Sequence, residues 1–312
     1  MMSPRNHVAL KQTTQSFWRA CAGAIVLSLA PGAGAIAEGL QTEWVEGHNV
    51  RTRLVAGVIN PATDASAEHR QIVVGLEMEL GEGWKTYWRS PGDAGGVPPE
   101  FDWSGSTNAG TITVTYPAPH RMTDRSGNTV GYKSHVVFPV HVQPERRDDP
   151  VTVKLQLMFG VCKDICVPSE GSYEVTLPPS GAPPVPAVLA EALKRVPVRG
   201  SQDGTVAAGA AAEAGASVPR LAKVEAALDG ASPKVTMHVS FPRGATGADV
   251  FVEGPPGEFI PLPKQKGTVG ANTLVFEIDL TEGADVAALR GQKLVATIVS
   301  DAAQSEQSFV LK

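Results

Sequence analysis

The strongest constraint on the fold is a series of short segments in which apolar and polar residues partly alternate, separated by turns rich in Gly, Pro and Asp. Clear examples lie at 50–58, 71–80 and 151–159. Alternation with a period of two is typical of half-buried β-strands. With 32 Gly and 25 Pro in 312 residues and an aromatic content of 6%, the composition favours many strands joined by turns over a helical bundle. We therefore expect an all-β fold.

Two groups of such segments define the expected domain organisation. Residues 38–180 contain roughly six or seven strands at a spacing typical of an immunoglobulin-like antiparallel β-sandwich. Residues 218–312 predict a second, smaller sandwich without a cysteine. Between them, residues 181–217 contain a stretch of helical periodicity from Val185 to Val196 and then an Ala/Gly-rich linker. The expected fold is two immunoglobulin-like antiparallel β-sandwiches joined by a short helix and a flexible linker.

Residues 1–37 have the pattern of a signal peptide. Three basic residues lie before or at the start of an apolar run at 20–30, and small residues follow. The run is shorter than the about 20 residues that a membrane helix needs. We expect cleavage near Ala37 and a periplasmic mature chain. An uncleaved membrane anchor is the alternative.

Removal of this segment makes the chain more acidic than the net charge of −5 of the full sequence, because it carries three basic residues and no acidic one. No basic cluster of the kind that binds nucleic acid remains, and no later apolar run approaches the length of a membrane helix. We expect no nucleic-acid partner and no transmembrane span in the mature chain. Cleavage also removes Cys21, which leaves two of the three cysteines in an oxidising compartment.

These two cysteines, Cys162 and Cys166, are the candidate catalytic residues. In a straight strand their Cα atoms would lie about 13 Å apart, whereas a disulfide requires roughly 4.4–6.8 Å. If the two thiols pair, the chain must therefore turn at Lys163, Asp164 and Ile165. A three-residue hairpin loop satisfies this requirement.

The short ring favours redox chemistry over a structural role. In the chain-entropy model, closing about five residues contributes only about 2 kcal/mol, less than a long loop would contribute. A tight ring is also reduced more easily when it is strained. A passive disulfide in a non-redox binding or scaffold protein is the alternative. The adjacent charges do not decide between them, because Lys163 favours a thiolate and Asp164 opposes it.

Two segments resemble a known family. Residues 159–168 (FGVCKDICVP) and 83–93 (GWKTYWRSPGD) are similar to the N-terminal periplasmic domain of the thiol:disulfide interchange protein DsbD, and most of all to its ScsB (suppressor of copper sensitivity) branch. The resemblance is strong over about residues 40–180. It implies an immunoglobulin-like domain whose cysteines accept electrons from a membrane thiol electron transporter and pass them to periplasmic thioredoxin-like proteins. It also implies that Cys166 is the partner-facing cysteine.

The resemblance further implies a loop that shields the cysteine pair until a partner docks. The candidate segment is 87–97, with Tyr87, Trp88 and Asp93 as cap residues and an aromatic contact with sulfur from Tyr87 or Trp88. Residues 122–132 are a second candidate flap.

The sequence departs from the family in two respects. Full-length relatives continue into a multi-helix membrane domain and a thioredoxin-like domain, and neither pattern is found here, so we expect the electron donor to be a separate chain. The better-known branch also spaces its cysteines more widely than Cys-x3-Cys.

Binding of copper or another soft metal is the rival chemistry. Besides the cysteines, the available ligands are Met122, Met158, His120, His135 and His141. The spacing Cys-x2-Cys or His-x3-His does not occur, and the histidines are scattered. We expect no metal site and no cofactor, with a copper-handling protein as an alternative. Hydrolase motifs such as Gly-x-Ser-x-Gly and His-Glu-x-x-His are absent from the sequence.

Overall fold

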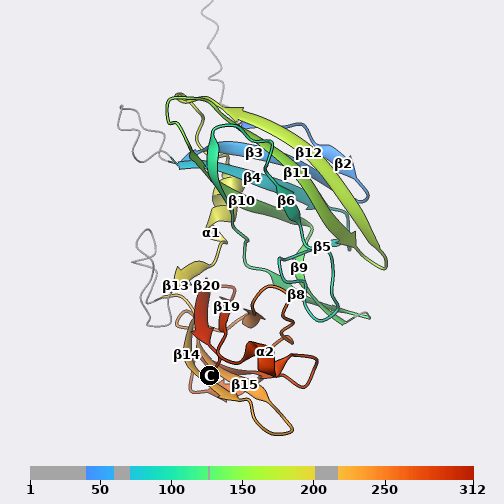
Figure 1. Ribbon diagram of the computed structural model, residues 1–312, viewed down its shortest axis with the longest axis vertical. Helices are drawn as coiled ribbons and strands as arrows, with labels where there is room; N and C mark the ends of the chain where they lie inside the picture. The colour runs from blue at the N-terminus through green and yellow to red at the C-terminus, as the bar shows by residue number, and fades with distance from the viewer. Residues whose placement is uncertain (1–39, 60–70, 126, 201–216) are drawn as a thin grey trace, which may run out of the picture. The chain divides into compact units, whose positions relative to one another are not determined.

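The computed structural model describes residues 40–59, 71–125, 127–200 and 217–312. In these ranges the chain forms four β-sheets, which pair as two sandwiches (Figure 1). The expected all-β fold with two immunoglobulin-like sandwiches is confirmed. The predicted signal peptide at 1–37 and most of the predicted linker, 201–216, lie outside the described residues.

The first sandwich consists of two sheets. One has the strand order β1-β3-β4-β10-β7, with β2 beside β3. Its strands are β1 (Leu40–Gln41), β2 (Val45–Gly47), β3 (Val50–Ile59), β4 (Gln71–Leu80), β7 (Ala109–Val114) and β10 (His135–Pro144). The other has the order β12-β11-β5-β9-β8, with β6 beside β11. Its strands are β5 (Lys85–Tyr87), β6 (Glu100–Asp102), β8 (His120–Asp124), β9 (Gly127–Lys133), β11 (Val151–Cys162) and β12 (Cys166–Leu177).

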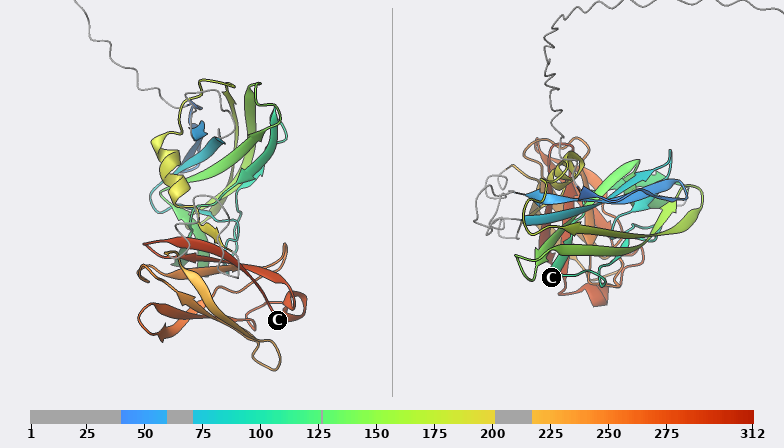
Figure 2. Two further views of the ribbon diagram at one scale, coloured as in Figure 1. Left: turned by 90° about the vertical axis from the view of Figure 1, so that its left-hand side faces the viewer. Right: turned by 90° about the horizontal axis from the view of Figure 1, so that it is seen from above.

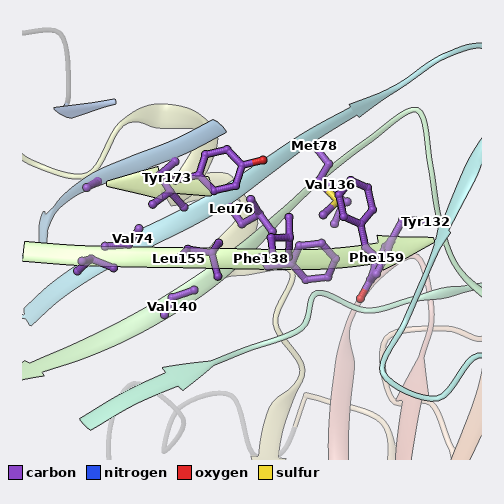
Figure 3. Packing of buried hydrophobic residues seen from close by; sticks show 14 of the residues in the cluster. Val74, Leu76, Met78, Tyr132, Val136, Phe138, Val140, Leu155, Phe159 and Tyr173 are labelled. Atoms are coloured by element: carbon purple, nitrogen blue, oxygen red, sulfur yellow. The ribbon is translucent and has the colours of Figure 1, made fainter. Parts of the chain in front are cut away.

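Alternation along the strands builds the core between these two sheets. On β11, Val153, Leu155 and Leu157 are buried, while Lys154 and Gln156 between them are exposed. Successive side chains of a strand point to opposite faces, so the apolar set enters the sandwich and the polar set meets solvent. Figure 3 shows residues from both sheets packed together in this core.

Phe138 of β10 lies in the middle of this core and is fully buried (Figure 3). Its ring packs edge-on against the rings of Phe101, Tyr116 and Tyr132, with centroids 5.3–5.9 Å apart. Edge-to-face pairs of this kind add stabilisation beyond the area they bury.

The helix expected at Val185–Val196 is present as α1 (Ala187–Lys194). Figure 2 shows α1 beside the first sheet. Leu189 and Ala192 on the buried face of the helix pack against the outer side of this sheet. Gly75 of β4 permits this approach, because a Cβ there would come within 2.8 Å of the Leu189 side chain.

The second sandwich follows the helix. Its sheets have the orders β13-β20-β19-β16 and β14-β15-β18-β17. The strands are β13 (Val198–Gly200), β14 (Arg220–Ala227), β15 (Lys234–Ser240), β16 (Asp249–Glu253), β17 (Lys264–Val269), β18 (Thr273–Asp279), β19 (Lys293–Val299) and β20 (Gln304–Val310), and the short helix α2 (Val286–Leu289) precedes β19. Both sandwiches and α1 belong to one compact unit in the described part of the chain.

Residues 198–200, which follow α1, form the short strand β13, and this strand pairs in parallel with β20. The second candidate flap lies in the β8–β9 hairpin, and β9 also pairs with β5. Thr123 and Asp124 of this hairpin are exposed, whereas Thr129 is buried. No helix in the described ranges has the length and apolar character needed to cross a membrane.

The core position of Phe138 leads to a first prediction. Phe138→Ala should lower the free energy of unfolding by about 3–5 kcal/mol, because it removes a buried ring and leaves a cavity among three others. Urea denaturation of the oxidised protein measures this. Lys154→Ala, on an exposed position that forms a surface ion pair with Glu174, should change it by less than about 0.5 kcal/mol. Equal losses in the two variants would contradict the placement of the core.

Candidate functional site

The cysteine pair closes the long hairpin of β11 and β12 (Figure 1). The strands are paired in register along their whole length, and the last pair is Cys162 with Cys166. Lys163, Asp164 and Ile165 form the loop, in which the Lys163 N–H donates to the Ile165 carbonyl at 3.0 Å. The two Cα atoms lie 4.1 Å apart and the sulfurs form a disulfide. The predicted three-residue hairpin loop is confirmed.

The two sulfurs differ in their exposure to solvent. Cys162 is 1% exposed, because β11 lies inside the sheet and its last residue pairs with Lys85 of β5 on one side and with Cys166 on the other. Cys166 is exposed, because it begins β12 at the edge of the sheet. A thiol from another protein can therefore reach Cys166 more easily than Cys162.

Tyr87, the last residue of β5, lies against the disulfide. Its phenolic oxygen is 2.7 Å from Sγ of Cys162 and 3.2 Å from Sγ of Cys166. The phenol O–H donates to the Cys162 sulfur, which is a weak acceptor. The side chain is 2% exposed and is thus enclosed together with the buried sulfur.

Burial raises the pKa of Tyr87 above its ordinary value of 10.0, and the negative charge of Asp124 raises it further. Both causes disfavour the phenolate. The phenol therefore keeps its proton at neutral pH and remains a hydrogen-bond donor toward the sulfur.

The segment after β5 covers the Tyr87 ring. Gly96 lies so close to this ring that a Cβ at Gly96 would overlap it. The next residue, Val97, accepts a hydrogen bond through its carbonyl from the Gly160 N–H of β11 at 3.0 Å. Tyr87 is thus held between the disulfide and the backbone of residues 96–97.

A polar cluster with a buried lysine lies beside Cys162. Lys85, its neighbour on β5, is 5% exposed. The Lys85 ammonium donates to Thr129 Oγ1 at 3.0 Å and forms an ion pair with Asp124. Sequence reasoning missed these three residues, because Lys85 is separated from its partners by 39 and 44 positions and no local pattern marks them.

The three predicted cap residues have different positions. Tyr87 is the one that the structure places within hydrogen-bond distance of the sulfurs. Trp88 points to the opposite face and is buried in the core at 2% exposure, with its ring centroid 5.9 Å from that of Phe251. The Asp93 carboxylate accepts a hydrogen bond from the Leu262 N–H at 3.0 Å. The positions of Trp88 and Asp93 therefore favour contacts with the second sandwich over a direct cap on the sulfurs.

The candidate metal ligands do not converge in the described ranges, where no three His, Cys, Asp or Glu side chains are arranged to hold a metal ion. His135 Nε2 lies 2.9 Å from Glu77 Oε1, Met122 is buried in the β8–β9 hairpin, and Met158 is 47% exposed on β11. None of these positions favours copper chemistry.

Comparison with known proteins adds to this geometry. Residues 57–178 match the family described as thiol:disulfide interchange protein DsbD, N-terminal, and this stretch includes Tyr87 and both cysteines. The crystal structure of the N-terminal periplasmic domain of ScsB from Proteus mirabilis is similar in fold, with a TM-score of 0.62 and 20% sequence identity, covering 88% of this chain and 98% of that chain. No curated protein matches the chain.

The contact between Gly96 and Tyr87 yields a second prediction. Gly96→Ala should speed the reduction of the disulfide by dithiothreitol about tenfold, because the new methyl group displaces either the ring or the covering segment and so eases local opening. Stopped-flow or quenched thiol assays measure the rate. In Gly95→Ala the methyl group meets no atom within 4 Å, and this variant controls for backbone strain, since φ at Gly95 is also positive. Equal acceleration in both variants would show that the ring contact does not matter.

Proposed function

We propose that this chain, whose residues 57–178 form a DsbD-like N-terminal domain, is a thiol–disulfide exchange module acting through Cys162 and Cys166. The observation that carries the proposal is the asymmetric disulfide: an exposed Cys166 joined to a buried Cys162 at the tip of a hairpin. A disulfide that only stabilised the fold would require neither an exposed sulfur nor a hydrogen-bond donor against the other one.

The chemistry begins when the thiolate of an electron donor attacks Sγ of Cys166. A mixed disulfide forms between the donor and Cys166, the intramolecular S–S bond breaks, and Cys162 leaves as a thiolate. A second donor thiolate then attacks the donor's own sulfur in the mixed disulfide and releases Cys166. Two electrons have entered this chain, and the donor is left with the disulfide.

The second half of the cycle reverses these roles. The Cys166 thiolate attacks the disulfide of an acceptor, and a new mixed disulfide forms. Cys162 then attacks Cys166 Sγ, which restores the intramolecular disulfide and releases the acceptor as a dithiol. In this scheme Cys166 contacts both partners, and Cys162 is the resolving cysteine.

Tyr87 stabilises the leaving group in the first step. Its O–H already points at Cys162 Sγ, where negative charge develops as the disulfide breaks. A hydrogen bond to a charged acceptor is stronger than one to a neutral sulfur. The contact therefore strengthens along the reaction, which is the condition for lowering the barrier.

The proposed partners are a membrane thiol electron transporter as donor and periplasmic thioredoxin-like proteins as acceptors. The family description and the periplasmic origin of the similar ScsB domain support this assignment. It implies export by a cleaved signal peptide at 1–37, a redox domain at 38–180, a connecting region at 181–217 and a second domain at 218–312. Ile165, which is 65% exposed beside Cys166, offers an apolar contact for a docked partner.

A trapping experiment tests the assignment of the two cysteines. Cys162→Ala, with its remaining thiol activated by Ellman's reagent, should form a stable mixed disulfide with a bacterial thioredoxin that keeps only its attacking cysteine. Cys166→Ala, treated in the same way, should give about tenfold less complex, because its remaining sulfur is buried. Non-reducing gel electrophoresis measures the yield.

Two results would contradict the proposal. A higher yield from Cys166→Ala would reverse the cysteine roles. A wild-type disulfide that exchanges with no reduced thioredoxin-like protein over minutes would leave only a structural role.

The role of Tyr87 can be tested separately. Tyr87→Phe, in a reduced Cys166→Ala background, should raise the pKa of the Cys162 thiol by about one unit, because the thiolate loses a charge-assisted hydrogen bond. The pH dependence of alkylation by iodoacetamide measures this pKa. Tyr173→Phe removes the hydroxyl that contacts Thr52 from β12, the strand that pairs with β11, and should leave the pKa of the Cys162 thiol unchanged. An unchanged pKa in Tyr87→Phe would exclude the proposed stabilisation.

A further inference from the structure

The residues that follow Tyr87 contact the second sandwich rather than the disulfide. Trp88 packs its ring against Phe251 of β16, and Phe251 belongs to the same buried cluster as Trp88. Arg89 pairs with Glu253 of β16 and with a carboxylate of β20. Four residues further along, Asp93 accepts the Leu262 N–H. Three of the six residues 88–93 thus contact the second sandwich.

Arg89 is the central contact of the three. Its Nε lies 2.8 Å from Glu253 Oε1, and one terminal nitrogen lies 2.6 Å from Glu253 Oε2. The same nitrogen lies 2.6 Å from Glu306 Oε2. The planar guanidinium thus binds the Glu253 carboxylate through two nitrogens and donates a further hydrogen bond to Glu306. A lysine ammonium cannot reproduce this geometry.

The surroundings of Arg89 make these contacts stronger than ordinary surface ion pairs. The side chains are partly buried, with exposed fractions of 27% for Arg89, 20% for Glu253 and 15% for Glu306. The guanidinium carbon also lies 4.6 Å above the Trp88 ring. Removing the cation would leave Glu253 partly desolvated without this counter-charge, and Glu306 would keep only its ion pair with Arg199.

We propose that the second sandwich is the positioning element for the redox site and that Arg89 is its principal positioning residue. The second sandwich holds residues 88–93 and thereby fixes the backbone of Tyr87. In this position the Tyr87 phenol reaches Cys162 Sγ, and residues 96–97 cover the ring. The proposal deepens the proposed function, on which it rests for the effect on disulfide exchange.

The physical basis is the short chain between the anchor and the phenol. Arg89 is two residues from Tyr87, and the Trp88 N–H is bonded to the Val130 carbonyl at 3.0 Å. Among residues 88–93, loss of the Arg89 contacts leaves Trp88 and Asp93 as the remaining attachments to the second sandwich. This loss lowers the free energy of local opening. A looser segment lets solvent and small thiols reach Cys162 and weakens the burial of Tyr87.

The test compares Arg89→Ala with Arg121→Ala. Arg121 also links the two sandwiches, with its Nε 2.9 Å from Asp249 Oδ2 and a terminal nitrogen 2.8 Å from the Pro263 carbonyl. The Arg121–Asp249 pair is similarly buried, at 21% and 20% exposure, but Arg121 belongs to β8 and lies outside residues 88–93. Urea denaturation establishes that both variants are folded and compares their stability.

Two readouts separate positioning from general stabilisation. The first is the rate at which dithiothreitol reduces the disulfide under native conditions. The second is the pKa of the Tyr87 phenol, obtained by ultraviolet titration of each protein against its own Tyr87→Phe derivative. We expect Arg89→Ala to be reduced about tenfold faster than wild type and its Tyr87 pKa to fall toward 10.0, because burial raises that pKa. Arg121→Ala should stay within about twofold of wild type in rate.

Arg89→Lys should give a rate of disulfide reduction between those of wild type and Arg89→Ala, because it keeps the charge and loses the bidentate contact with Glu253. A wild-type rate and pKa in Arg89→Ala would overturn the proposal, and so would equal acceleration in Arg121→Ala. If these contrasts appear while wild type exchanges with no thioredoxin-like protein, positioning stands and the proposed function fails. If exchange occurs without these contrasts, positioning alone fails.

Discussion

The site depends on the register of one hairpin. Pairing of β11 with β12 places Cys162 directly opposite Cys166, with the three-residue loop between them. A slip of one residue would send every side chain of one strand to the other face of the sheet and separate the sulfurs. The buried set Val153, Leu155 and Leu157 opposes such a slip, because it would expose apolar side chains. Core packing thus fixes the geometry of a disulfide that itself lies at the rim of the sheet.

The same sheet makes the two sulfurs chemically different. β12 is an edge strand and β11 is not, so Cys166 meets solvent while Cys162 is enclosed by β5 and by Tyr87. In the proposed exchange cycle, this difference in exposure makes Cys166 the attacked sulfur and Cys162 the leaving sulfur. In the proposed arrangement, the second sandwich acts on this chemistry at a distance, through Arg89 and the short segment that leads back to Tyr87. A cysteine-free domain would then have a role in the redox reaction.

Much of this site could be predicted from local patterns. If Cys162 and Cys166 form a disulfide, chain dimensions require a turn at Lys163–Ile165 between them. Helical spacing of apolar residues likewise predicted α1. The sequence left a residue's role open where that role depends on distant strands. Trp88 and Tyr87 are adjacent aromatics in the sequence, and only the pairing of β5 with β9 and β11 decides that Tyr87 contacts sulfur while Trp88 enters the core. The polar residues of 122–132 and its Gly127-Asn128 turn signal indicated a loop, whereas the structure has parts of β8 and β9 there.

The sequence by itself determined the all-β class, the turn that a disulfide between Cys162 and Cys166 requires, and the candidate reactive atoms, because these follow from period-two alternation, chain dimensions and thiol chemistry. Tertiary structure decided which sulfur is exposed, which aromatic residue donates a hydrogen bond to the buried sulfur, and which charged side chains surround the two sulfurs. Lys85, Asp124 and Thr129 meet beside Cys162, and Arg89 meets Glu253 and Glu306, only after strands from separate parts of the chain have packed together. Such contacts join positions far apart in sequence, and no local periodicity records them.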